Sequence, residues 1–188
     1  MKKILLTSTL AVSLISIGCD NTGNQNQDSK DRAEEINKDR DLPKKDADFV
    51  VEAASKGMKE VEVSRVAAER AATPEVKQFA QMMIEYHTNA NQELNQLASR
   101  LNIAAPQSLP EDKREDMNDL NDINGMDFDK RYMKMMVDDH EKNINKFEDA
   151  AENAESPDLK NWASTTLPKL RHHLDMARQT HDRIKDMN

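Results

Sequence analysis

The feature that most constrains the fold is a repeated stretch of sequence. AAERAATPEVKQFA, which begins at Ala67, corresponds to AAENAESPDLKNWA, which begins at Ala150, with seven identities in fourteen positions. Each copy contains a hydroxyl residue followed by proline, at 73–74 and 156–157. This pair is a helix start signal, because the hydroxyl caps unpaired amides and the fixed φ of proline suits the first helical position. A duplicated helical hairpin predicts an all-α four-helix bundle.

The period of the apolar residues predicts four helices, at residues 46–72, 74–102, 127–155 and 157–185. The intervening residues 103–126 hold two prolines and a glycine among charged residues, which predicts a loop or a loop with one short helix. This segment is long enough to cross the length of a bundle. Both an up-down-up-down order and a ferritin-like crossover are therefore compatible with the sequence.

The N-terminus predicts export. Two lysines precede an apolar run of about 14 residues, which is too short to span a bilayer and is typical of a secretory signal peptide. The run ends at Cys19, the one cysteine of the chain, in a context that resembles the lipobox of bacterial lipoproteins although Ser16 replaces the usual leucine. We expect lipidation of Cys19; the alternative is a cysteine inside a discarded signal. The predicted organisation is a signal peptide at 1–19, a flexible tether at 20–45 and the bundle domain at 46–188.

The charge of the chain limits its partners. The formal net charge is −8, and it becomes −10 when Lys2 and Lys3 leave with the signal peptide. An acidic chain lacks the clustered basic face that nucleic-acid binding requires. Acidic surfaces also repel anionic headgroups, so membrane attachment would depend on the lipid anchor. We expect a cell-envelope lipoprotein, facing the periplasm or the surface and held at the outer membrane, with a protein partner or a homo-oligomer left open.

Four polar residues interrupt the apolar stripes of the four predicted helices. At the helical period, Glu60, His87, His140 and His173 each fall within the core-facing stripe of a different helix. Counted from the hairpin turns at about 1.5 Å per residue, each lies roughly 20 to 25 Å along its helix. The four side chains are therefore expected to meet in one layer at the middle of the bundle.

Three imidazoles and a carboxylate at one level predict a transition-metal site, with zinc, copper or iron as the ion. The alternative is a buried hydrogen-bond network among the same side chains. Met83 and Met136 each lie one turn before a histidine on the same helix face, so they are candidate soft ligands for copper. The alternative for these methionines is core filling.

The helices also resemble the bacterial envelope family called domain of unknown function 4142, which is placed in the ferritin-like superfamily. The resemblance covers about residues 46–182. It rests on Lys59, Glu60, Val61, Glu62, Val63, Ser64, Phe79, Ala80, Met83, His87, Phe128, Asp129, Tyr132, Met136, Val137, Asp139, His140, Leu167, Pro168, Leu170, His173 and Leu174. It implies an exported ferritin-like bundle and brings no established activity.

The sequence departs in two places from the patterns of related proteins, and these departures limit the kind of metal site that is expected. Tyr86 stands where the family usually has an acidic residue. The Glu-x-x-His motif of ferritin-like di-iron proteins is absent, because Ile84, Val137 and Leu170 occupy the positions three before the histidines. Ferroxidase chemistry is therefore not implied. The repeat also aligns Glu60 with Asn143 and His140 with Gly57, so any site is expected to be asymmetric and mononuclear.

The sequence thus favours an exported, lipid-anchored ferritin-like bundle that binds a transition metal in its core, with a role in metal handling or in oxidative or envelope stress. Two alternatives stay open. One is a non-catalytic envelope interaction or stress protein with a buried His/Glu network. The other is a copper chaperone or storage protein that uses both histidine and methionine. No catalytic residue and no reaction can be assigned, so whether the chain is an enzyme is undetermined.

Overall fold

The computed structural model describes residues 28–187, and the predicted signal peptide and Cys19 lie outside them. Four long helices form the bundle: α2 (Lys44–Arg70), α3 (Pro74–Arg100), α5 (Gly125–Asn153) and α6 (Pro157–Ile184). Their bounds agree with the predicted helices to within about two residues. The fold is all-α and ferritin-like, as predicted. Within the described residues, no helix is both long and apolar enough to cross a membrane.

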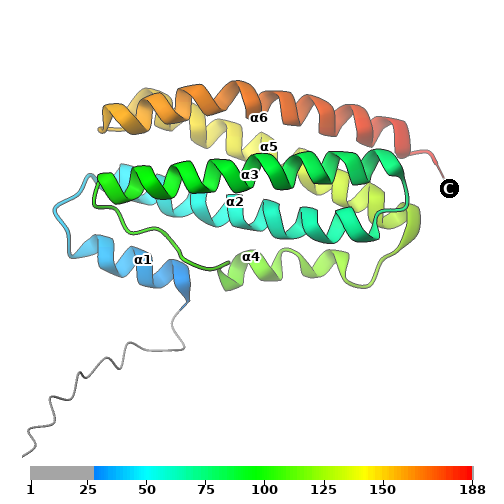
Figure 1. Cartoon of the computed structure of the whole chain (residues 1–188), viewed down its shortest axis with the longest axis horizontal. Helices are drawn as coiled ribbons and strands as arrows, with labels where there is room; N and C mark the ends of the chain where they lie inside the picture. The colour runs from blue at the N-terminus through cyan, green and yellow to red at the C-terminus, as the bar shows by residue number, and fades with distance from the viewer. Residues whose placement is uncertain (1–27, 188) are drawn as a thin grey trace, which may run out of the picture.

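The connection between the two hairpins settles the order of the helices. Figure 1 shows that α3 ends at one end of the bundle and α5 begins at the other, so residues 101–124 cross its length. The segment carries the short helix α4 (Glu111–Glu115) and the 3-10 turn η1 (Asn118–Leu120). This is the predicted loop with a short helix, and it gives the ferritin-like crossover.

The segment before the bundle differs from the sequence-based expectation. The sequence predicts a flexible tether at 20–45, but residues 29–38 of that segment form helix α1 (Ser29–Lys38), which packs against α2. Ala33 is buried, and the Asn37 carboxamide donates to the Ala104 carbonyl and accepts from the Ala104 amide. Polar contacts at the start of α1 add to these: Lys30 pairs with Glu52 of α2, and the Ser29 hydroxyl accepts hydrogen bonds from the amides of residues 107 and 108. Because most of these contacts are polar, the period of the apolar residues does not predict them.

Each interhelical turn is held by an aspartate from the other hairpin. Asp129 of α5 accepts hydrogen bonds from the Ala72 and Thr73 amides and from the Thr73 hydroxyl. Asp46 of α2 accepts from the amides of Glu155 and Ser156. These carboxylates satisfy amides that a turn between two helices leaves unpaired, and they couple the two hairpins reciprocally.

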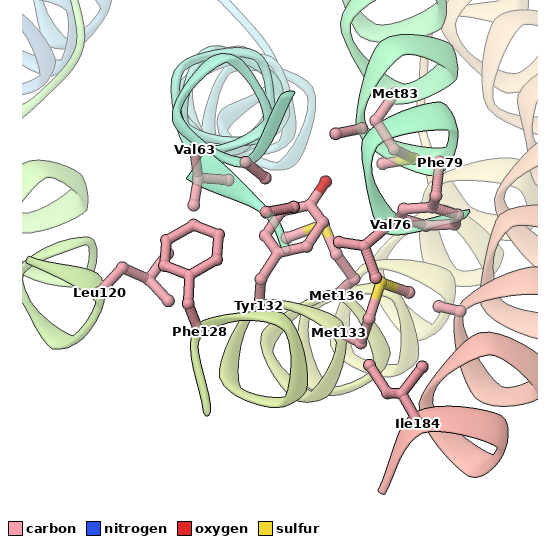
Figure 2. Packing of buried hydrophobic residues seen from close by; sticks show 14 residues of the cluster. Val63, Val76, Phe79, Met83, Leu120, Phe128, Tyr132, Met133, Met136 and Ile184 are labelled. Carbon is pink, nitrogen blue, oxygen red and sulfur yellow. The ribbon is translucent and has the colours of Figure 1, made fainter. Parts of the chain in front are cut away.

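The apolar core is divided along the bundle axis. One cluster, shown in Figure 2, fills the half near the α2–α3 turn, where Tyr132 is fully buried and meets the Ser64 hydroxyl at 2.9 Å. Two further clusters fill the half near the α5–α6 turn, around Leu94 and Phe147. On α2, α3 and α5, the position predicted for the polar layer falls between these clusters. On α6, His173 lies between Leu170 and Leu174, near the end of the cluster around Phe147.

We predict that Asp129→Ala lowers the free energy of unfolding by about 2 to 4 kcal/mol, because three hydrogen bonds to a buried carboxylate are lost. Urea unfolding followed by circular dichroism measures the effect. Asp138→Ala on the same helix is the control, since Asp138 only pairs with Lys134 on the surface and its loss should cost less than about 1 kcal/mol. Equal costs for the two variants would contradict a structural role for Asp129.

Candidate metal centre

The four predicted polar residues meet in one buried layer. The exposed fractions of Glu60, His87, His140 and His173 are 2%, 4%, 0% and 3%. The ring centroids of His87, His140 and His173 form a nearly equilateral triangle with sides of 5.6, 5.6 and 5.8 Å. The helical period alone therefore placed all four side chains correctly, and the division of the apolar core leaves room for them.

Each histidine turns one ring nitrogen toward the others. One nitrogen from each of the three rings lies within 4.8 Å of the other two. His87 Nε2, His140 Nε2 and His173 Nδ1 are buried and have no hydrogen-bond partner. Three nitrogens bound to one zinc ion at about 2.0 to 2.1 Å would be roughly 3.4 Å apart, so small side-chain movements would complete such a site.

The opposite edges of two rings are held by hydrogen bonds. His87 Nδ1 lies 2.9 Å from a Glu60 carboxylate oxygen, and His140 Nδ1 lies 2.8 Å from the Met136 carbonyl oxygen. Because both oxygens can only accept, each Nδ1 carries a proton, and Nε2 is the ring nitrogen left to bind a metal ion. These contacts select the tautomers that a metal ligand needs.

Glu60 lies beside the triad with both carboxylate oxygens engaged. One oxygen accepts from His87, and the other accepts from the Asn143 carboxamide at 3.0 Å. Burial alone would raise the pKa of Glu60, but the neighbouring His87 and His140 outweigh it and lower the pKa to about 2. Glu60 is therefore ionised near neutral pH.

Burial keeps two of the imidazoles neutral. Burial, with help from His140 and His87, lowers the pKa of His173 to about 3. Burial also lowers the pKa of His140, although the Glu60 carboxylate opposes the effect. At neutral pH the layer thus holds a negative charge next to neutral imidazoles, which suits a cation.

The two methionines and Tyr86 occupy different surroundings. Met83 and Met136 are fully buried in the apolar cluster of Figure 2, where they pack with aromatic and aliphatic side chains. Tyr86, by contrast, lies against the site, with its ring centroid 4.5 Å from that of His173 and 5.1 Å from that of His87. Burial raises the pKa of Tyr86 to about 12, so its hydroxyl stays protonated.

Sequence reasoning missed two partners of this layer. Asn143 is three residues after His140, on the same face of α5, and it is the repeat counterpart of Glu60, so both signals were available. The Met136 carbonyl could be anticipated only from the tendency of a ligand histidine to donate its second nitrogen to a backbone oxygen.

Comparisons with known proteins agree with the fold. A crystal structure of a secreted DUF305 protein from Streptomyces coelicolor is similar to this chain, with a TM-score of 0.64 and 14% identity over 75% of this chain and 94% of that one. At this identity the likeness shows the fold alone. No curated protein matches the chain. The family described as "Domain of unknown function (DUF4142)" matches residues 31–180, and the chain therefore belongs to the DUF4142 family.

Proposed function

We propose that this protein is an extracytoplasmic helical bundle that binds one transition-metal ion through His87, His140 and His173. The observation that carries the proposal is that the three rings each bring one nitrogen within 4.8 Å of the others and that each ring has a buried nitrogen without a hydrogen-bond partner. An unsatisfied buried polar group costs roughly 1 to 3 kcal/mol, so three at one point favour a shared ligand. In the alternative hydrogen-bond network, these nitrogens would be paired with protein groups.

The donor set limits the ion and its chemistry. Three imidazoles suit zinc, copper or iron, and the neighbouring carboxylate offsets the charge of a divalent cation. An ion held by three imidazoles keeps a position for water or another small ligand, at which it can act as a Lewis acid. We assign Met83 and Met136 to the core, because their surroundings are apolar.

Export is the second part of the proposal. The predicted signal peptide and the lipobox-like context of Cys19 support it, and the similar Streptomyces protein is described as secreted. We propose a protein of the cell envelope, anchored through a lipid at Cys19 and held at the outer membrane. A role in metal handling or in oxidative or envelope stress suits that location.

We predict that residues 20–188, purified without an affinity tag from metal-supplemented medium, contain about one transition-metal ion per chain by elemental mass spectrometry. His140→Ala should lose the metal, because one of three donors is gone. His172→Ala is the control, since His172 is next to His173 but exposed. Metal-free wild-type protein with an intact fold would refute the proposal, and equal loss in both variants would point to unspecific binding.

Glu60→Gln should weaken metal affinity by about 10- to 100-fold without abolishing it. The reason is that Glu60 orients the His87 ring through a hydrogen bond to Nδ1 and does not itself bind the metal ion. Competition with a chromogenic chelator measures the affinity. The partly exposed Glu62 on the same helix gives the control Glu62→Gln, which should bind like the wild type. A loss as complete as in His140→Ala would instead make Glu60 a direct ligand, as the sequence predicted.

The metal-free protein should lose stability as the pH falls below about 6.5. The pKa of His173 is about 3 in the folded state and near 6.5 in the unfolded chain, so the unfolded chain binds more protons between these values. By pH 5.5 this linkage costs about 1.4 kcal/mol. The lowered pKa of Glu60 acts in the same direction below its ordinary value of 4.5.

Urea unfolding at pH 7.5 and pH 5.5 tests this linkage. His173→Gln should reduce the difference between the two pH values by about 1.4 kcal/mol, whereas His172→Gln should leave it unchanged. An unchanged difference in His173→Gln would mean that His173 is not held neutral in the folded state.

A further inference from the structure

The sequence repeat is reproduced in space, residue by residue. The offset that aligns Ala67 with Ala150 is 83 positions, and it also relates the two turn-capping residues, Asp46 and Asp129. The aromatic pair Phe79–Tyr132 and its counterpart Trp162–Phe49 have the same centroid distance of 6.2 Å. Each residue of the histidine layer therefore has a structural counterpart in the other half of the bundle.

The counterparts of the histidines are apolar, and two of them are small. By the same offset, His140 corresponds to Gly57, His173 to Ala90 and His87 to Leu170, while Glu60 corresponds to Asn143. These four counterparts all line one cavity of about 460 Å³. The three histidines thus occupy one set of repeat positions, and the equivalent positions of the other set line the cavity.

This cavity has the size and lining of a small-molecule site, for which volumes of about 300 to 1,000 Å³ are usual. Phe49, Tyr86, Phe147 and Trp162 give it aromatic walls. Three of these rings pack on one another, with centroid distances of 5.1 Å for Phe49–Phe147 and 5.4 Å for Phe147–Trp162. The walls are therefore preformed.

Within the described part of the chain, the cavity lining contains polar groups without partners, which include the buried Trp162 Nε1 and the Asn91 carboxamide. Among the described residues, the Asn91 carboxamide has no hydrogen-bond partner. It lies directly over Gly57, where an added Cβ would come within 2.0 Å of Asn91 Oδ1. Gly57 thus makes room for a carboxamide that offers both a donor and an acceptor between aromatic walls.

The charges around the cavity are balanced. Its lining includes four lysines and five carboxylates, and Lys30 and Lys56 both pair with Glu52. The ionised Glu60 and the His87 ring also line it, so the cavity reaches the histidine layer. A carboxylate at that position disfavours an anionic ligand.

We propose that this cavity binds an uncharged aromatic molecule with a hydroxyl group, of the phenol class, with its ring between the aromatic walls and its hydroxyl on Asn91. The hydroxyl matches a carboxamide because both groups donate and accept. Delivery of such a molecule to a metal ion rests on the proposed function; its binding in the cavity does not.

The test uses Trp162, the single tryptophan of the chain, as a reporter in the cavity wall. The ¹⁵N-labelled chain of residues 20–188 is prepared both metal-free and supplemented with zinc. Each sample is titrated with p-cresol, p-xylene and 4-methylbenzoate. In p-xylene a methyl group replaces the hydroxyl of p-cresol. We expect p-cresol to shift the indole N–H resonance saturably in both samples. We expect p-xylene to bind roughly three- to tenfold more weakly, since it lacks one hydrogen bond, and 4-methylbenzoate to bind least.

Two variants locate the binding. Ala90→Phe should fill the cavity and abolish p-cresol binding, whereas Asn89→Phe on the exposed side of α3 should not. Asn91→Leu should remove the preference for p-cresol over p-xylene; the repeat counterpart of Asn91 is Leu174, so the bundle accepts leucine there. Asn91→Leu therefore tests the proposal even if Ala90→Phe does not fold.

No saturable shift with p-cresol, tighter binding of 4-methylbenzoate, or unchanged binding in both variants would overturn the proposal. Binding confined to the zinc-supplemented sample would overturn it too, because the ligand would then sit on the metal. Zinc content is measured on the same samples, so the absence of a metal site and the absence of a phenol site give different results.

Discussion

The burial of three imidazole nitrogens without partners is the constraint on which the rest of the structure depends. Desolvation of these atoms costs free energy that the apolar clusters on either side must offset. The layer lies at mid-bundle, where all four helices contribute and where the apolar packing above and below is continuous. Within the layer, hydrogen bonds to Glu60 and to the Met136 carbonyl fix the orientations of the His87 and His140 rings.

Charged residues next to the layer connect it to the crossover segment. Lys59, adjacent to Glu60, is buried and pairs with Asp139 at 2.9 Å and with Asp116 at 3.2 Å. These carboxylates raise the pKa of Lys59 against the effect of burial. Because Asp139 precedes His140 and Asp116 belongs to the crossover, this ion-pair group ties the position of the crossover to the helices that carry the site.

The fold and the four polar residues could be predicted because both depend on periodicity. The Thr-Pro and Ser-Pro starts and the helical period place Glu60, His87, His140 and His173 inward at one height whatever the helix order. The helix order itself could not be predicted, since a crossover and an up-down path give the same stripes. The packing of α1 could not be predicted, because apart from Ala33 it depends on polar contacts such as those of Lys30 and Asn37. The lipidation of Cys19 stays a prediction outside the described residues.

The asymmetry of the repeat separates this bundle from a symmetric two-metal protein. In such a protein each half would supply equivalent ligands, and the di-iron motif would appear in both hairpins. Here the ligand candidates come from three helices, while their counterparts Gly57, Ala90 and Leu170 surround a cavity. Positions that are equivalent in the repeat thus carry histidines in one set and line a cavity in the other. A duplicated hairpin can in this way place a cavity beside a layer of histidines without any change in the arrangement of the helices.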